Sequence, residues 1–253
     1  MDWHTRYLQQ ATWTRDLRAY LFKNAGLDDA SRVHTAAQRR ASLVLEVGCG
    51  TGAILSELPG HTSLHGLDLD AEALIQCRTH APGVSLVQGN ALQLPYSNAI
   101  FEIVYCHFLL LWVNDPLQAL LEMKRVGKPG AHIIAFAEPD YTRRVDEPSE
   151  LLALGQWQSE SLKRQGADPG LGARLANLFL RAGIKIIETG TIQNTGRNPS
   201  PEEWEIEWAV LESDLAGFIS SGDLHKMKKL DQAAWERGDR VLYVPTYFAW
   251  GHT

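Results

Sequence analysis

Three glycines at alternate positions form the first pattern in the chain that suggests a binding site. Gly48, Gly50 and Gly52 directly follow an apolar run at 43–47. Glycine there permits a sharp turn and lets a ligand approach the bare backbone. A plain tight turn is the alternative, and three glycines in five residues argue against it. The dinucleotide-binding spacing G-x-G-x-x-G does not fit, because its third glycine would have to occupy the position of Ala53.

Polar side chains follow the next two apolar runs, at 64–67 and 84–87. Asp68 stands at the end of the first of these runs, where a carboxylate can accept hydrogen bonds from both hydroxyls of a ribose. Asp70 competes for this role, but it stands where a helix would begin and is better used as the helix cap. After the second run comes the segment 88–95, whose polar side chains could read a purine edge; a plain loop is the alternative.

The elements that must position these residues alternate along the chain. Apolar, β-rich runs predict strands, and three- and four-residue apolar spacing predicts helices between them. Right-handed crossovers would place the strands in one mostly parallel sheet with helices on both faces and ligands at the carboxyl ends of the strands. The predicted strands are 43–47, 64–67, 84–87, 101–106, 131–137, 184–191 and a closing strand at 241–250. The predicted helices are 2–24, stretches beginning near Ala53, Asp70 and Asp115, and 149–164, 171–182, one from Ser200 and 223–237, with a loop at 138–148.

Composition favours one large globular domain. The 253 residues are 45% hydrophobic and 21% charged, and the net charge of -6 argues against a generalised nucleic-acid surface. Cys49, Cys77 and Cys106 are an odd number without paired metal spacing, which favours reduced thiols and no metal site. The first residues lack the pattern of a secretory signal, and the most apolar run, 108–113, is far shorter than the roughly 20 residues of a membrane span. We therefore expect a soluble cytoplasmic protein.

The glycine segment 46–52, Asp68, the segment 89–95 and the turn 125–130 together resemble the class I S-adenosylmethionine-dependent methyltransferases, over about residues 41–137. The resemblance implies a three-layer Rossmann-like α/β fold with a seven-stranded, mostly parallel sheet. It implies one methyltransferase domain at 1–253, with a helical N-terminal cover at 1–40, a cofactor-binding core at 41–137, and substrate-side helices and last strands at 138–253. A helical insertion would precede the last strand. Two departures, Gly127 and Ala131, affect only the approach to the fifth strand.

The same resemblance assigns S-adenosylmethionine as cofactor, S-adenosylhomocysteine as product, and a set of cofactor contacts. Glu46 would fix the glycine loop and the methionine end, Asp68 would hold the ribose, and Leu69 would pack on the adenine. Asn90 stands where the family often has Asp, and its carbonyl can still accept a hydrogen bond from the adenine amino group. The implied cofactor residues are Glu46, Gly48, Cys49, Gly50, Gly52, Asp68, Leu69, Asn90, Ala91, Leu92 and His107.

The implied reaction is in-line attack on a sulfonium methyl, so holding donor and acceptor in attack geometry can be the largest contribution of the protein. His107, at the end of the fourth predicted strand, is the candidate base or polar contact; a hydrogen-bonded histidine that does not titrate in turnover is the alternative. Glu138 and Tyr141 follow the fifth strand and are candidate substrate contacts or, alternatively, loop anchors.

A lid over the site would come from the N-terminal helix and the insertion. Tyr7, Trp13 and Trp204 are its candidate lining residues, with ordinary core packing as the alternative. Six acidic residues at 202–214 disfavour a phosphate-backbone partner, although a solvated helix face is the simpler account of them.

A small-molecule acceptor, with no nucleic-acid or membrane partner, is the predicted substrate class. The chain has no nucleic-acid-binding domain, basic stripe or Asn-Pro-Pro-Tyr run. We expect a monomer or homodimer. A nicotinamide oxidoreductase is disfavoured because its glycine spacing and a Tyr-x-x-x-Lys motif are missing. A protein of this fold that binds the cofactor without transferring methyl stays open, because a fold does not fix a function.

Overall fold

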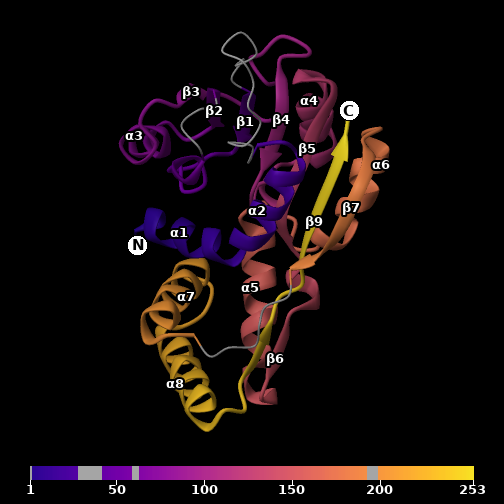
Figure 1. Ribbon diagram of the computed structural model, residues 1–253. Helices are drawn as coiled ribbons and strands as arrows, with labels where there is room; N and C mark the ends of the chain where they lie inside the picture. Colours follow the sequence, from indigo (N-terminus) through magenta and orange to yellow (C-terminus); the bar gives the residue numbers. More distant parts are fainter. Residues whose placement is uncertain (1, 28–41, 59–62, 193–198) are drawn as a thin grey trace.

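A seven-stranded sheet forms the centre of the protein, which is described here as a computed structural model covering residues 2–27, 42–58, 63–192 and 199–253 (Figure 1). Its strands are β1 (Leu43–Val47), β2 (Ser63–Asp68), β3 (Ser85–Gln88), β4 (Phe101–Cys106), β5 (Gly127–Pro139), β7 (Lys185–Ile192) and β9 (Thr246–His252). They lie in the order β3-β2-β1-β4-β5-β9-β7. The first five strands are parallel, and β9 runs antiparallel to both β5 and β7. The predicted mostly parallel α/β sheet is thereby confirmed.

Helices cover both faces of this sheet and give the molecule three layers. One core face buries α4 (Pro116–Val126) against β4 and β5, and α6 (Leu175–Arg181) against β7 and β9. The opposite core face buries α2 (Arg15–Asn24) and α3 (Ala71–His80). Side chains of α4 spaced three apart, Leu120, Met123 and Val126, are fully buried, which is the stripe that helical periodicity predicts. The helix begins at a cap from Asp115 with proline in its first turn.

The N-terminal helix is broken where the sequence predicted continuity. Residues 2–24 form α1 (Trp3–Trp13) and α2, separated at Thr14, whose φ of -108° and ψ of 4° leave the helical region. The Thr14 hydroxyl donates to the Ala11 carbonyl at 3.3 Å, which is the local competition with helix hydrogen bonding that threonine offers. The predicted N-terminal cover at 1–40 lies partly outside the described residues, which omit 1 and 28–41.

The prediction of a helix from near Ala53 is wrong. Among residues 53–58, which the structure describes, a short 3-10 turn forms at Leu55–Glu57, and Leu58 is already extended, with a φ of -81° and a ψ of 149°. Leu58 precedes Pro59, and the proline ring excludes the residue before it from the helical region. The glycine loop therefore leads into a tight turn instead of a full helix.

Two further predictions are corrected in the second half of the chain. The segment 241–250 is not one strand: β8 (Val241–Tyr243) and β9 are separate, with Pro245 between them. The segment 138–148, predicted as a loop, begins inside β5 and contains β6 (Val145–Glu147), which pairs antiparallel with β8. The two strands are about a hundred residues apart in sequence, so no local pattern could indicate that β6 exists or that β8 pairs with it.

The helical insertion before the last strand is present and forms a separate layer at one end of the molecule (Figure 1). It consists of α7 (Pro201–Asp214) and α8 (Ser221–Arg237), which pack with α5 (Leu152–Arg164) through a third buried cluster. A capping box of Ser200 and Glu203 starts α7, as the Ser-Pro-Glu-Glu sequence predicts. The side chain of Gln9 in α1 donates to the Glu203 carbonyl at 3.2 Å, so α1 bridges the sheet and the insertion.

Candidate active site

A cavity of about 330 Å³ opens where β1, β2 and β4 end. Its volume lies in the range of small-molecule sites, about 300–1,000 Å³. The glycine loop and Asp68 line one side, and α1, the turn after β4, α5 and α7 line the rest. The wall consists of Trp3, Arg6, Tyr7, Gln10, Glu46, Gly48, Cys49, Gly50, Ala53, Ile54, Asp68, His107, Phe108, Leu109, Leu111, Trp112, Pro139, Tyr141, Leu162, Gln165, Val210, Ser213 and Asp214.

The three glycines of the loop adopt positive φ angles of +76° at Gly48, +49° at Gly50 and +83° at Gly52. A β-carbon on Gly48 would lie 2.7 Å from a methyl carbon of Leu109, and one on Gly52 would lie 2.6 Å from the sulfur of Cys77. Both the backbone conformation and the space therefore require glycine. Gly48 and Gly50 line the cavity, whereas Gly52 lies outside its wall and packs against α3.

The two acidic residues at the end of β2, Asp68 and Asp70, form different hydrogen bonds. One carboxylate oxygen of Asp68 accepts a hydrogen bond from the Gly50 amide at 2.7 Å, and the other accepts one from the Asp70 amide at 2.9 Å. Asp68 lines the cavity. Asp70 accepts from the Glu72 amide at 2.8 Å and caps α3. The capping argument made from the sequence therefore separates the two residues as the structure does.

Glu46 and Cys49 contribute buried, uncharged surface to the wall. The Glu46 side chain accepts a hydrogen bond from the Tyr105 hydroxyl at 3.1 Å, and burial raises the pKa of Glu46 well above its usual range. A hydrogen bond with Cys77, followed by burial, raises the pKa of the Cys49 thiol. A protonated thiol is a poor nucleophile, so Cys49 acts as packing beside the loop.

The residues predicted for the adenine lie outside the cavity wall. The Leu69 side chain is 69% exposed at the end of β2. Asn90 accepts from the Leu92 amide at 2.9 Å through its side-chain carbonyl, the atom expected to meet the adenine amino group. Ala91 and Leu92 pack against the core. Their contacts with an adenine ring stay predictions.

His107 lies in the cavity wall, and its ring forms a hydrogen bond with the N-terminal cover. Its Nε2 atom is 2.9 Å from the Thr14 hydroxyl, at the junction of α1 and α2. Burial and then the positive charge of Arg18 lower the pKa of His107 to about 3. The imidazole is therefore neutral at physiological pH and a weak base, which is the arrangement of the alternative considered from the sequence. Its catalytic role stays a prediction.

The five residues predicted to contact substrate separate into three groups. Tyr7 and Tyr141 line the cavity. Trp13 lies behind the wall, with the Arg6 guanidinium 4.9 Å from its ring centre. Glu138 and Trp204 do not reach the cavity.

Glu138 is a loop anchor. Its carboxylate accepts hydrogen bonds from the backbone amides of Leu109, Leu110 and Leu111 at 2.8–3.1 Å, and burial raises its pKa to about 7. Trp204 donates through its indole nitrogen to Asp231 at 2.6 Å in the insertion. Both side chains are used to hold structure, so the substrate role predicted for them has no support in this geometry.

Several wall residues were not predicted from the sequence. Trp3, Arg6 and Gln10 accompany Tyr7 on one face of α1, at the three- and four-residue spacing of a helix. Once one residue of this face is assigned to the site, the helical spacing predicts that the others line it too. Gln165, Ser213 and Asp214 come from the ends of α5 and α7, and nothing in the local sequence marks them.

A model of the "Methyltransferase domain" family matches residues 45–135. A demethylmenaquinone methyltransferase of Shouchella clausii is 41% identical over 164 residues, which cover 56% of this chain and 69% of the relative. The chain belongs to the S-adenosylmethionine-dependent methyltransferase family. It spans about half the length of other curated relatives that it matches.

Solved structures of methyltransferases share the fold. A Bacillus halodurans C-125 protein assigned as a methyltransferase has a TM-score of 0.63 at 15% identity, over 92% of this chain and 96% of that one. Geranyl diphosphate C-methyltransferase of Streptomyces coelicolor, solved with S-adenosylhomocysteine, has a TM-score of 0.52 at 12% identity, over 83% and 69% of the two chains. At these identities the likeness concerns the fold alone.

The residues present fit S-adenosylmethionine, the cofactor of this methyltransferase family. Gly48 and Gly50 form a cradle that any side chain would fill, and Asp68 holds a carboxylate beside it. Hydrogen-bond acceptors for ribose hydroxyls and a bare backbone for the methionine end are therefore adjacent. Within the described ranges, no group of three or more His, Cys, Asp and Glu is arranged to hold a metal ion.

Proposed function

We propose that this methyltransferase transfers a methyl group to a small-molecule acceptor bound in the chamber between α1, α5 and α7, releasing S-adenosylhomocysteine. The observation that carries this proposal is the continuity of one cavity, whose wall includes Gly50 and Asp68 at one side and Tyr141, Gln165 and Asp214 at the other. A donor held by the loop and an acceptor held by the insertion would share this space.

The chain acts mainly by holding and enclosing the reactants. S-adenosylmethionine, when bound, supplies an electrophilic methyl group. Gly48 and Gly50 present bare backbone, Asp68 offers its carboxylate to the ribose, and Leu69, Asn90, Ala91 and Leu92 are proposed for the adenine side. The His107 ring is neutral at neutral pH and cannot act as an imidazolium acid, so its proposed part is a polar contact in the wall or a weak base. Fixing the acceptor in attack geometry is then the largest contribution of the protein.

The walls of the chamber suit a flat, largely apolar acceptor. Aromatic rings come from Trp3 and Tyr7 in α1, Phe108 and Trp112 after β4, and Tyr141 after β5. Aromatic side chains bury flat molecules over a large area and also attract cations to their faces. Helix α1 contributes Trp3, Arg6, Tyr7 and Gln10 to the wall of this chamber.

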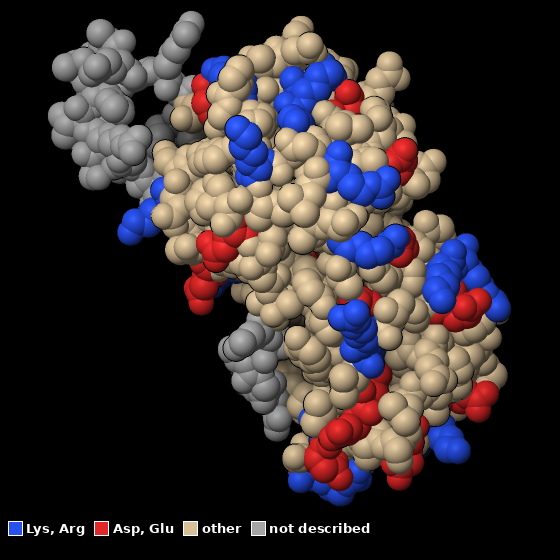
Figure 2. All heavy atoms as spheres, turned by 90° about the vertical axis from the view of Figure 1, so that its right-hand side faces the viewer, with Lys and Arg blue, Asp and Glu red and all other residues tan. Residues whose placement is uncertain are grey.

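We further propose that nucleic acids are not substrates and that the protein acts in the cytoplasm as a single domain, monomeric or dimeric. On the face drawn in Figure 2, basic side chains are scattered among acidic and uncharged ones and form no stripe. A phosphate backbone binds best to clustered Lys and Arg. Among the described helices, none combines the length and apolarity that crossing a membrane requires.

Calorimetric titration with S-adenosylmethionine and S-adenosylhomocysteine tests the cofactor half of this proposal, with nicotinamide dinucleotides as controls. We expect saturable binding of the first pair only, in the micromolar range or tighter, about -8 kcal/mol. A panel of small aromatic amines, phenols and quinols is then incubated with S-adenosylmethionine, and release of S-adenosylhomocysteine is measured by mass spectrometry. Binding of cofactor without turnover on any acceptor class would favour the non-methylating alternative.

A further inference from the structure

A carboxylate in the wall of the cavity has no ion-pair partner among the described residues. Asp214 is the last residue of α7 and lines the cavity together with Tyr141 and Gln165. Within the described part of the chain it forms no ion pair, and the nearby guanidinium of Arg6 is engaged by Glu207 and Gln9. Burial raises the pKa of Asp214, and hydrogen bonding by Gln158 and the charge of Arg6 act against this rise.

The orientation of this carboxylate is fixed by Gln158 of α5. An Arg144 nitrogen donates to the side-chain oxygen of Gln158 at 2.5 Å. Arginine has no acceptor, so the oxygen of Gln158 must face Arg144 and its NH₂ group must face the other way. That NH₂ group donates to one oxygen of Asp214 at 3.1 Å. Position 214 must therefore present an acceptor to Gln158.

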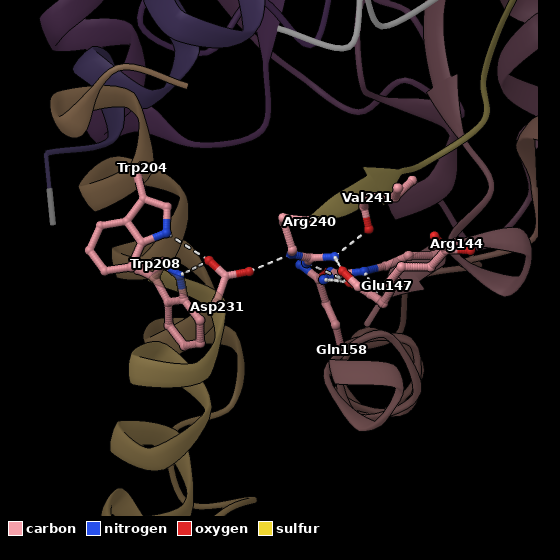
Figure 3. Close-up of polar contacts among 9 residues, drawn as sticks. Arg144, Glu147, Gln158, Trp204, Trp208, Asp231, Arg240 and Val241 are labelled. Atoms are coloured by element: carbon pink, nitrogen blue, oxygen red, sulfur yellow. Dashed lines mark hydrogen bonds and ion pairs between the residues drawn. The ribbon is translucent and has the colours of Figure 1, made fainter. Parts of the chain in front are cut away.

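Arg144 is itself held rigidly by a buried ionic network (Figure 3). It forms two hydrogen bonds with Asp146, at 2.7 and 2.9 Å, and Arg240 binds the same carboxylate at 2.7 Å. Arg240 also binds Asp231 at 2.5 Å. The other oxygen of Asp231 accepts from two tryptophan indoles, at 2.6 and 2.8 Å. The Arg144, Asp146 and Arg240 side chains are at most 4% exposed, so the network that leads to Asp214 is buried.

Asp214 keeps acceptor capacity that these contacts do not use. A carboxylate offers about four lone-pair sites. Gln158 uses one of them. A partly desolvated carboxylate without an ion-pair partner gains most from a group that brings both hydrogen-bond donors and positive charge.

We propose that Asp214 is a specificity-determining residue that binds a protonated amine on the methyl acceptor, with Gln158 as the residue that positions it. This inference rests on the proposed function, since it assigns the chemistry of the acceptor in the same cavity. Amine-bearing aromatic acceptors are thereby favoured over acceptors of equal size that carry a carboxylate or a neutral hydroxyl.

The network also predicts what a single conservative substitution does. In Asp214→Asn, Gln158 still donates, so the Asn carbonyl must face Gln158 and its NH₂ group must face the cavity. The substitution therefore replaces an acceptor by a donor at one point of the wall while the contact with Gln158 is kept. Glu212→Gln is the matched control, because Glu212 is on the same helix, pairs with Lys228 at 3.3 Å and lies outside the cavity wall.

The experiment uses the full chain saturated with S-adenosylhomocysteine and three probes of similar size: 2-phenylethylamine, 2-phenylethanol and 3-phenylpropanoate. For the unaltered protein and for Glu212→Gln, we expect calorimetry to show the amine binding at least tenfold more tightly than either other probe. For Asp214→Asn we expect at least a tenfold loss of amine affinity and a gain for the carboxylate. Gln158→Met should lower the amine preference while S-adenosylhomocysteine binding is kept, which a purely structural role would not produce.

The outcomes distinguish a failure of the proposed function from a failure of the role assigned to Asp214. If the unaltered protein does not bind S-adenosylhomocysteine, the proposed function itself is refuted. If it binds S-adenosylhomocysteine but binds no amine, or binds the alcohol or carboxylate equally well, the role of Asp214 is refuted and the proposed function stands. Asp214→Ser replaces Asp214→Asn if the latter no longer binds S-adenosylhomocysteine, and unchanged amine affinity in a folded variant overturns the inference.

Discussion

Removing the carboxylate of Asp68 should weaken cofactor binding without unfolding the protein. The Asp68 side chain accepts hydrogen bonds from the Gly50 and Asp70 amides at 2.7 and 2.9 Å and is assigned to the ribose hydroxyls. Asp68→Ala removes the carboxylate that we propose for the ribose hydroxyls and frees the Gly50 amide in the loop. Hydrogen bonds to charged groups contribute about 1.5–3 kcal/mol when buried. This site is partly exposed to solvent, so we expect a loss of about 1–3 kcal/mol, or about 5- to 150-fold in Kd.

Asp70→Ala is the matched control for this measurement. It removes the cap of α3, which accepts from Glu72, and should cost about 1 kcal/mol of unfolding free energy. Cofactor affinity should be unchanged, since Asp70 is not in the cavity wall. Titration with S-adenosylhomocysteine measures Kd, and urea unfolding followed by circular dichroism measures stability. An unchanged Kd in folded Asp68→Ala, or a larger loss of affinity in Asp70→Ala than in Asp68→Ala, would refute the assignment.

Three further outcomes are expected. Glu138, with its pKa raised to about 7, favours folding in its protonated form, so its contribution is full below about pH 4.3 and is lost as the pH rises through 7. The unfolding free energy of the unaltered protein relative to Glu138→Gln should therefore fall by up to about 3 kcal/mol between pH 4 and 8 in urea titrations, and a difference independent of pH would contradict this. His107→Ala should keep cofactor affinity and slow turnover; unaltered turnover removes His107 from the catalytic candidates. Arg240→Ala leaves the buried carboxylate of Asp231 without an ion-pair partner and leaves Asp146 with Arg144 alone, and should cost about 3–5 kcal/mol in urea unfolding. The exposed pair of Arg237, removed in Arg237→Ala as control, should contribute less than about 1 kcal/mol, and equal losses would contradict the ranking.

Local rules explain the parts of the fold and site that the sequence predicts correctly. Strands β1 and β4 have the predicted bounds, because strands buried on both faces read as continuous apolar runs. The glycine loop is recognised because its positive φ angles and close contacts exclude other residues. Asp68 and Asp70 are separated because helix capping is decided within two or three residues. The positive φ angles of the loop and the cap of α3 are local features, decided within a few residues along the chain.

Only the tertiary structure decides which side chains share the cavity and which hold the frame. Glu138 carries a carboxylate, as Asp68 does, but its oxygens accept hydrogen bonds from three backbone amides of a turn 27–29 residues away. The pairing of β6 with β8, and the chain of contacts that ends at Asp214, join segments that are distant in sequence. Such contacts depend on how whole elements pack, so a composition, a motif or a period cannot contain them. The sequence by itself determines the class of the protein and its cofactor loop, and the packing of α1, α5 and α7 decides what the other half of the cavity presents to its acceptor.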